Sequence, residues 1–590
     1  MKQFFKMMFA STLGVFVAIG LISAIFMSVM IGMVASMGSQ TEYVPKQNTV
    51  FKLSLKGSLT EIANENPMDM FMGKTDKPVT LNVMLKAIRT AKENDNIKGI
   101  YLDAGSFGAG TATVEALYRE LKDFKESGKF LIAYADFYSL GTYYLCSLAD
   151  KVFLNPKGVL DMPGLASTPF FVKGLGEKIG VKPEIFRVGT YKGAVEMFML
   201  DKLSDENREQ IETYVGGIWN TLTQGIAEAR NIPQQKINEF ADEGYFMAKA
   251  EKAVEAGFID ELKYRPEAEE YVKEQSGQTG DKLKTVSINK IRNITAKKGK
   301  KKDAKIAVLY AEGTIEHHKE ASPYSSQTVN ITEKMADELI KLKDNDDIKA
   351  VVFRVNSGGG SAYVSEQIWR EVVELKKVKP VVVSMGDMAA SGGYYIACAA
   401  NKIVAEKNTL TGSIGVFGVY SDATELFKKI GVTTDVVKTN KFSDMTNISR
   451  PWREDEKAIM QSAIEDVYDL FLTRCADGRG MSKEEIDKVG QGRVWTGEDA
   501  LERGLIDELG GMDKAIEIAA ELADLTDYEI TNVSSSQDFF KQLLEKQMED
   551  IKVSLVKDVL GDDYWQFQKI NQLKSMNGVM ALCPYGIDKF

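Results

Sequence analysis

The stretch DMAASGGYY, residues 387–395, decides the fold, because an earlier stretch of the same chain repeats its spacing. That stretch is DFYSLGTYY, residues 136–144, so the last tyrosines, at 144 and 395, lie 251 positions apart. A second pair of matching stretches, residues 253–262 and 500–509, closes both copies at an offset of 247. The chain is therefore predicted to be a tandem duplication that covers most of each half.

The two copies have kept different polar residues. At the offset of 251, Ser391 of the second copy faces Leu140 of the first, and Lys192 of the first copy faces Ser443 of the second. A candidate nucleophile therefore survives only in the second copy, and a candidate base only in the first. A duplication kept for packing alone has no reason to divide polar groups in this way, so we expect one active site assembled from both copies.

Short apolar runs alternate with helical periods in each copy. In the second copy the runs predict buried strands at residues 306–310, 350–355, 380–385 and 402–405. Residues 366–375 and 391–399 are predicted to be helices. Strands that alternate with helices indicate an α/β fold of parallel βαβ units with right-handed crossovers.

The changes in composition along the chain predict five segments. These are a signal anchor at 1–40, a first repeat at 45–265, a polar lysine-rich linker at 266–304, a second repeat at 305–525 and a C-terminal helical extension at 526–590. The linker contains Lys297, Lys298, Lys300, Lys301 and Lys302, which indicate a solvated connection or, alternatively, attraction to anionic lipid headgroups. The extension has an amphipathic stretch at 539–555 that suits packing or an oligomer contact.

The N-terminal segment has the pattern of an uncleaved signal anchor. Lys2 and Lys6 are followed by no charged residue before Glu42, and residues 7–37 are almost wholly apolar or small. This length exceeds the roughly 20 residues that cross a bilayer. The two lysines predict a cytoplasmic N-terminus, with the bulk of the chain on the outer side of the cytoplasmic membrane.

Composition excludes several other kinds of protein. The net charge of −10 over 590 residues argues against a general nucleic-acid binder. The four cysteines have no metal-ligand spacing, so we expect neither a metal site nor a disulfide, but buried small side chains. Only two histidines exist, the adjacent His317 and His318, which we expect in a solvated loop. A dispersed Ser-His-Asp design is therefore disfavoured.

Ser391, Lys192 and the glycine turn at 357–361 are the residues that could carry chemistry. Ser391 follows a predicted strand and opens a helix among small residues, where free N–H groups could stabilise an oxyanion, although a helix N-cap serine has the same pattern. Lys192 lies on a loop of small residues; burial would favour the neutral amine, whereas a surface lysine is the alternative. The glycine turn exposes N–H groups that could serve a carbonyl oxygen or a phosphate.

Four motifs resemble the signal peptide peptidase A family of membrane-bound serine proteases in its long, tandem-repeat form. They are residues 386–394, residues 410–418, residues 188–192, and residues 494–497 with 504–507. The resemblance covers nearly the whole chain. It implies two tandem Clp/crotonase-like repeats with an N-terminal transmembrane helix.

The same resemblance implies roles for individual residues. Ser391 would be the nucleophile and Lys192 the general base, with oxyanion donors at Gly359 and Gly392 and a supporting hydroxyl at Ser413. The chain departs from the family at Gly358, where proline is usual, which weakens the oxyanion assignment.

The expected function is hydrolysis of released signal peptides and other extended apolar peptides at the outer face of the cytoplasmic membrane. No cofactor is expected, and the expected assembly is a ring-like homotetramer with enclosed sites. Two alternatives remain open from the sequence: a crotonase-like acyl-CoA enzyme and a non-catalytic membrane scaffold. Cleavage-site preference, and whether the Ser/Lys pair forms within one chain or across two, are also left open.

Overall fold

The computed structural model describes residues 43–62, 79–244, 249–294, 304–318, 331–533 and 578–582, besides positions 6, 7, 14, 20 and 21. Apart from those five positions, the predicted anchor lies outside the described residues, as do the lysine cluster at 297–302 and the amphipathic stretch at 539–555. Within the described part of the chain, no helix combines the length and the apolar character needed to span a bilayer.

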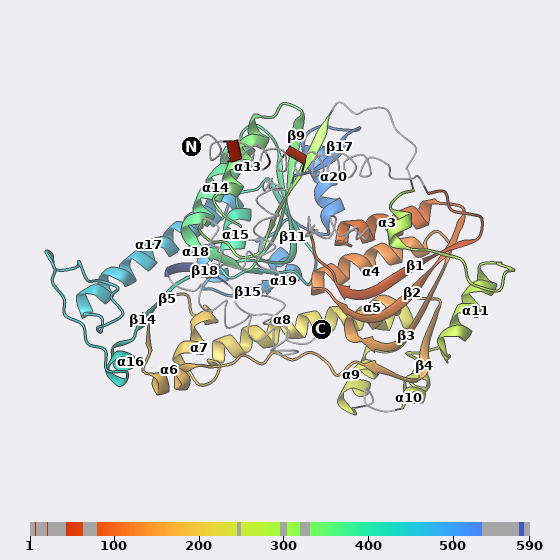
Figure 1. Cartoon of the computed structure of the whole chain (residues 1–590), viewed down its shortest axis with the longest axis horizontal. Helices are drawn as coiled ribbons and strands as arrows, with labels where there is room; N and C mark the ends of the chain where they lie inside the picture. The colour runs from red at the N-terminus through yellow and green to blue at the C-terminus, as the bar shows by residue number, and fades with distance from the viewer. Residues whose placement is uncertain are drawn as a thin grey trace.

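The first repeat is a parallel six-stranded sheet (Figure 1). Its strands, in spatial order, are β7 (Thr285–Val286), β1 (Thr49–Ser58), β2 (Ile97–Gly108), β3 (Phe130–Ser139), β4 (Lys151–Asp161) and β6 (Glu261–Leu262). The connecting helices include α3 (Leu81–Glu93), α4 (Thr111–Lys125) and α5 (Leu140–Cys146). Residues 99–104 of β2 and 131–135 of β3 are buried without interruption, as expected for strands that are covered on both faces.

The second repeat is built around the larger sheet. Its path is β17 (Glu529–Val533), β8 (Lys305–Glu312), β9 (Ile348–Ser357), β11 (Val381–Ala390), β13 (Leu410–Gly412) and β15 (Val494–Thr496); β12 (Lys402–Ala405) joins β11 to β16 (Glu508–Leu509). Helices α13 (Lys334–Asp344), α14 (Ala362–Lys376), α15 (Gly392–Ala397) and α20 (Met512–Leu522) flank it. The four strands and two helices predicted for this copy are confirmed, with ends that differ by a few residues.

The second sheet repeats the strand order of the first and adds β15, so the predicted duplication is confirmed. When 251 is added to the residue numbers of β4, 151–161, the result is 402–412. This range runs from the first residue of β12 to the last residue of β13. Leu140 is the first residue of α5 after β3, and Ser391 stands at the same place between β11 and α15. Leu140 is buried in the core of the first repeat.

A third, antiparallel sheet joins the two repeats. Its order is β10 (Gly359–Ser361), β18 (Gly578–Leu582), β14 (Val416–Asp422) and β5 (Lys182–Val188). Strand β5 leaves the first repeat and pairs over its whole length with β14 of the second. The chain then returns to the first repeat through the long helix α8 (Asp205–Arg230), drawn in yellow in Figure 1.

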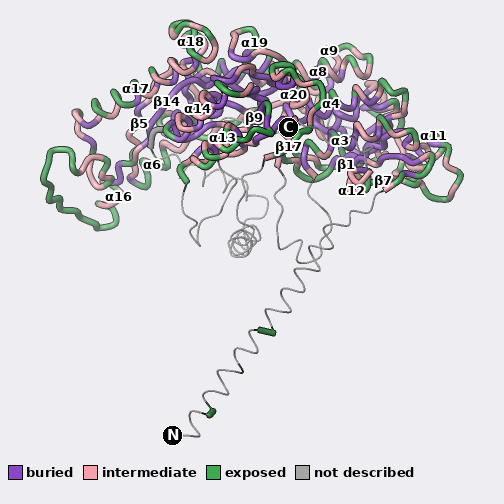
Figure 2. The backbone as a smooth tube through the Cα atoms, turned by 90° about the horizontal axis from the view of Figure 1, so that it is seen from above, coloured by how far each residue is buried: buried purple, intermediate pink, exposed green. Residues whose placement is uncertain are grey.

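The described residues form further helices besides those named above. They are α6 (Lys173–Ile179), η1 (Gly193–Val195), α7 (Glu196–Met199), α9 (Gln234–Asp242), α10 (Ala250–Glu255), α11 (Arg265–Gln275), α12 (Ile288–Ile291), α16 (Thr424–Lys429), α17 (Glu454–Arg479), α18 (Lys483–Val489) and α19 (Gly497–Glu502). Figure 2 shows that buried residues follow the sheets, whereas the loop beside α16 is exposed.

Two predicted boundaries need correction. The segment 266–304 is not a linker throughout, because α11, β7 and α12 lie within it and β7 extends the first sheet. Its buried apolar residues, Ala268, Val272, Val286 and Ile291, are scattered among charged ones, which hid the pattern. The segment 526–590 is not wholly helical either, because β17 extends the second sheet and β18 the third.

Candidate active site

The two residues singled out by the repeat comparison lie side by side. Lys192 Nζ is 2.7 Å from Ser391 Oγ, and both side chains are buried. Ser391 comes from the second repeat, at the end of β11, and Lys192 from the first, four residues beyond β5. The contact is made within one chain.

Ser391 has a strained backbone. Its φ of 56° and ψ of −115° lie in a region that residues with a Cβ rarely adopt. Such strain costs of order 1–3 kcal/mol and is concentrated at functional sites. Ser391 occupies the N-cap position of α15 but makes no side-chain capping bond, whereas Ser139 does cap α5 in the first repeat. The N-cap alternative therefore does not describe Ser391.

The loop that carries Lys192 is fixed against the second repeat. Tyr191 N donates to Gln491 O at 2.8 Å, directly after the β5–β14 pairing ends. Gly492 has a φ of +78°, and a Cβ there would lie 2.6 Å from Lys192 N. Only glycine permits this approach, so residue 492 helps to set the position of the lysine.

Ser413 completes the surroundings of the amine. Its Oγ lies 3.0 Å and its carbonyl oxygen 3.1 Å from Lys192 Nζ. A carbonyl oxygen can only accept, so it takes one N–H of the lysine, and the Ser413 hydroxyl can take a second. In a neutral amine the lone pair would then remain for the Ser391 hydroxyl proton. This is the geometry that proton abstraction needs.

The two predicted oxyanion donors have different surroundings. Gly392 is the first residue of α15, next to Ser391. Gly359 lies in β10, and its N–H donates to Ser357 Oγ at 3.1 Å. A substrate carbonyl could use the Gly359 N–H only in competition with Ser357, a constraint that the sequence did not reveal.

The chain's own strand β18 lies between β10 and β14 in the third sheet. Met580 pairs antiparallel with Ser361 on one side and with Phe417 on the other. Its side chain is buried in a small apolar cluster with Ala194 and Val195, which follow Lys192 closely in the chain. An extended strand therefore fits between β10 and β14, with its buried side chain close to the lysine loop. No local pattern had indicated a strand at 578–582.

His317 forms a second serine–histidine–carboxylate arrangement. Its Nδ1 lies 2.8 Å from Glu333 Oε1, and its Nε2 lies 3.4 Å from Ser361 Oγ. Burial would raise the pKa of Glu333, but hydrogen bonds from His318 N–H and the His317 ring lower it overall. The expected solvent exposure is confirmed, since 58% of the His317 side chain is accessible. The contact with Ser361 was missed, because 44 residues separate the two.

Two features argue against His317 as the working base. Ser361 Oγ also accepts from Val364 N at 3.3 Å and so caps α14. The 3.4 Å separation is long for a bond to a hydroxyl.

Within the described ranges, no group of three His, Cys, Asp or Glu side chains could hold a metal ion. Cys146, Cys398 and Cys475 are buried, as expected, whereas Cys583 lies outside the described residues.

Comparisons with known proteins agree with the duplication. The chain matches the model of Peptidase family S49 at residues 123–279 and 373–526, and that of Clp protease at residues 297–410. It is 36% identical over 487 residues to Protease 4 of Haemophilus influenzae, covering 81% of this chain and 77% of that protein. It is 31% identical over 543 residues to the chloroplastic serine protease SPPA of Arabidopsis thaliana, covering 91% and 77%.

Among solved structures, a ClpP1 variant from Listeria monocytogenes matches 35% of this chain and 94% of its own, at 16% identity and a TM-score of 0.23.

Proposed function

Because the chain belongs to peptidase family S49 and is a serine protease, we propose that Ser391 and Lys192 are its catalytic dyad and that its substrates are released signal peptides. The dyad rests on one observation, the 2.7 Å separation of Lys192 Nζ and Ser391 Oγ in a buried site. The acyl-CoA and scaffold alternatives have no comparable support, since both halves match a peptidase family.

In the acylation step, neutral Lys192 takes the hydroxyl proton of Ser391, and Oγ attacks the carbonyl carbon of the peptide bond. The carbonyl oxygen becomes an oxyanion, for which the N–H groups of Gly392 and Gly359 are the proposed donors. Protonated Lys192 gives its proton to the leaving amine, which departs and leaves an ester on Ser391.

In the deacylation step, neutral Lys192 takes a proton from water, and the resulting hydroxide attacks the ester carbon. The tetrahedral intermediate collapses, Lys192 returns the proton to Ser391 Oγ, and the product leaves as a carboxylic acid that gives its remaining proton to water. Ser413 holds the amine in place throughout, through its hydroxyl and its carbonyl oxygen.

The substrate would bind as an extended strand where β18 now lies. Pairing with β10 on one side and β14 on the other would satisfy the peptide backbone, whatever its sequence. The apolar cluster around Met580 would favour an aliphatic side chain at that position. An extended apolar peptide such as a signal peptide has both properties.

The proposed location is the outer face of the cytoplasmic membrane, with residues 1–40 as the single-pass anchor. The support is the run of apolar residues at 7–37 and the lysines before it. An anchor would keep the site close to the bilayer that signal peptides leave.

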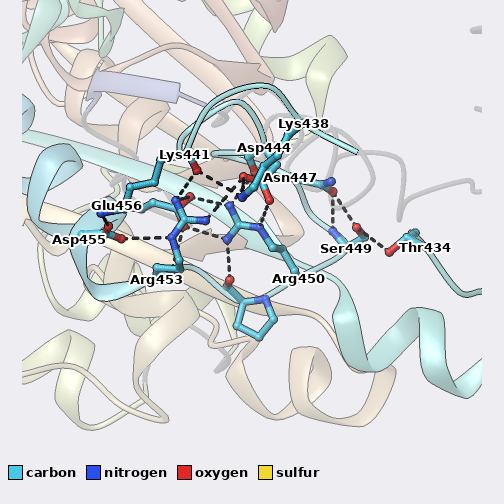
Figure 3. Close-up of polar contacts among 11 residues, drawn as sticks. Thr434, Lys438, Lys441, Asp444, Asn447, Ser449, Arg450, Arg453, Asp455 and Glu456 are labelled. Carbon is cyan, nitrogen blue, oxygen red and sulfur yellow. Dashed lines mark hydrogen bonds and ion pairs between the residues drawn. The ribbon is translucent and has the colours of Figure 1, made fainter. Parts of the chain in front are cut away.

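The proposed assembly is a ring-like homotetramer, and an exposed arm supports it. The arm, residues 430–453 between α16 and α17, is stabilised by Asp444 and Glu456, which bind Arg450 and Arg453 (Figure 3). Yet it exposes apolar side chains: Ile430, Val432, Val436, Val437, Phe442 and Ile448. Val437 is 97% exposed. An ordered apolar surface of this kind favours contact with another protein.

The duplication identifies what the arm would contact. At the offset of 251, β5 of the first repeat corresponds to residues 433–439 of the arm. Strand β5 pairs with β14. At the same offset, β14 corresponds to residues 165–171 of the first repeat, which form no strand within this chain. Residues 433–439 and 165–171 could therefore pair between two copies. Such a head-to-tail contact, repeated, closes a ring when the rotation permits.

Two measurements test the proposal. A fluorophosphonate should label Ser391, as located by mass spectrometry of the digested protein, and the label should be absent after Lys192→Ala. Labelling at Ser361 instead would refute the dyad. Sedimentation in mild detergent should show a tetramer that Val437→Asp dissociates and Val378→Asp, at an exposed valine outside the arm, does not. A monomer with full activity would refute the enclosed ring.

A further inference from the structure

The first turn of α4, in the first repeat, contacts two segments of the second repeat that lead to the active site. The first segment contains Asp387. Its carboxylate accepts from Thr113 N and from Thr113 Oγ, each at 2.8 Å. The N-cap residue of α4 is Gly110, which has no side chain to cap the helix, and a Cβ there would lie 2.1 Å from Asp387 Cγ. Asp387 therefore caps α4 from the other repeat.

Asp387 lies where strand β11 bulges. The pairing of β11 with β9 shifts between Met385 and Ala389, so the residues between them leave the regular ladder. A bulge re-aims side chains and increases the local twist, and this one ends two residues before Ser391. The second attachment of the bulge is Asn356, whose Oδ1 accepts from Met388 N at 3.1 Å.

The second segment is the loop 406–409, which leads into β13. Glu115 of α4 accepts from Lys407 N at 3.2 Å and from Asn408 N at 3.0 Å. Thr111 Oγ, in the same turn of α4, donates to Asn408 O at 3.1 Å. The loop is also joined to the bulge, because Thr409 Oγ donates to Gly386 O at 2.8 Å.

Both segments end at atoms of the proposed dyad. Strand β11 ends next to Ser391, and β13 ends at Gly412, whose carbonyl oxygen accepts from Ser391 N at 2.8 Å. Ser413 follows directly and contacts Lys192 Nζ. One helical turn therefore holds the strands that present both serines to the lysine.

We propose that Asp387 is a positioning residue, through which the first turn of α4 sets the placement of Ser391 and Ser413 around Lys192 Nζ. The inference rests on the proposed dyad. It gives the first repeat a second part in catalysis, since that repeat supplies the lysine and also fixes the strands that carry its partners. Loss of the Asp387 contact would leave the dyad residues present but misplaced.

The first repeat offers a matched control. Asp136 stands at the same place as Asp387, next to a register shift in β3. It binds Arg265, Tyr134 and Asn155, all within its own repeat, and its side chain is 58% exposed. Replacing it makes the same chemical change without touching the contact between the repeats.

The test compares Asp387→Ala, Asp387→Asn and Asp136→Ala in the full chain, with a fluorogenic peptide and with a fluorophosphonate. We expect Asp387→Ala to lower kcat by about 10- to 100-fold with KM nearly unchanged, because misplacement of reacting groups affects the chemical step. The rate of phosphonate labelling of Ser391 should fall by a similar factor. Asp387→Asn keeps an acceptor for Thr113 N–H and should recover most of both rates, and Asp136→Ala should change neither.

The folded fraction of each variant, from circular dichroism, separates positioning from stability. If the loss in Asp387→Ala only follows the unfolded fraction, or if kcat is unchanged, the proposal is wrong. Thr113→Val, which removes the hydroxyl donor but keeps the backbone one, covers the case in which Asp387→Ala does not fold; it should lower kcat with the fold intact. Full activity of Ser391→Ala would refute the dyad itself. It would also refute the positioning role of Asp387, because that role is defined by the placement of the dyad.

Discussion

Lys192 Nζ lies 2.7 Å from Ser391 Oγ, although 199 positions separate the two residues in the chain. Each belongs to a different copy of a duplicated fold, and the copy that has the serine lacks the lysine at the matching position. The contact exists because β5 crosses from the first repeat to pair with β14 of the second. The contact thus joins one residue from each repeat.

Removal of either member of the dyad should abolish hydrolysis. Ser391→Ala should reduce turnover of a fluorogenic peptide to background, and Lys192→Ala should lower kcat/KM by about 10²- to 10⁴-fold, the usual contribution of a general base. Lys192→His should not rescue activity, because the shorter imidazole would not reach Ser391. Lys182→Ala, at the exposed start of β5, is the control and should retain full activity. Turnover above background by Ser391→Ala, or a loss well below about 10²-fold for Lys192→Ala, would contradict the mechanism.

Ser413→Ala should have an intermediate effect. The variant loses the hydroxyl contact with Lys192 Nζ but keeps the carbonyl contact at 3.1 Å. Loss of one hydrogen bond to an amine that becomes charged should lower kcat by about 10- to 100-fold. The measurement is kcat and KM for the same peptide, and an unchanged kcat would show that the hydroxyl does not hold the lysine during the reaction.

Activity should fall on acidification for a reason that does not involve histidine. The protonated form of Lys192 cannot accept the Ser391 proton, so the active fraction decreases as the pH is lowered. The double variant His317→Gln, His318→Gln should leave the pH–rate profile in place. Ser361→Ala, which removes the hydroxyl near His317, should likewise leave the pH–rate profile in place. If the double variant loses the acidic limb or the activity, His317 is the base.

Strand β18 should compete with substrate. It pairs with β10 and β14, the two strands with which the substrate is proposed to pair, so a chain without it should bind peptides more readily. Tethered ligands reach effective concentrations of the order of millimolar, and deletion of residues 578–590 should therefore lower KM by about tenfold. Deletion of residues 583–590 alone keeps the strand and is the control. Equal KM values for all three chains would exclude competition.

Stability should decrease as the pH rises from about 4.5 to about 7. Burial, with a smaller contribution from the nearby Glu61, raises the pKa of Glu312 to about 7. The folded state therefore favours protonated Glu312, so its stabilising contribution is present below the unfolded pKa and is lost as the pH passes the folded one. Calorimetry at pH 5 and pH 8 should show a smaller drop in Tm for Glu312→Gln than for the parent. An identical drop would show that Glu312 does not carry this dependence.

Much of the fold could be predicted because its signals are local or repetitive. The apolar runs at 306–310 and 402–405 match β8 and β12, since a strand buried on both faces must be apolar throughout. Elements with few buried residues could not be predicted, because they have no continuous apolar run. In α11, only Ala268 and Val272 are buried, so its few apolar positions resembled the composition of a linker.

The amino-acid sequence by itself determined the duplication, the α/β class and the two residues that the copies do not share, because each of these is visible in the order of residues along the chain. Only the tertiary structure decided that Lys192 and Ser391 lie in contact, that the Ser391 side chain does not cap its helix, and that residues 578–582 pair between β10 and β14. These facts depend on contacts between distant segments, such as β5 with β14 and Asp387 with α4. Each such contact is made by a few polar atoms and by backbone pairing, which leave no periodic pattern in the sequence.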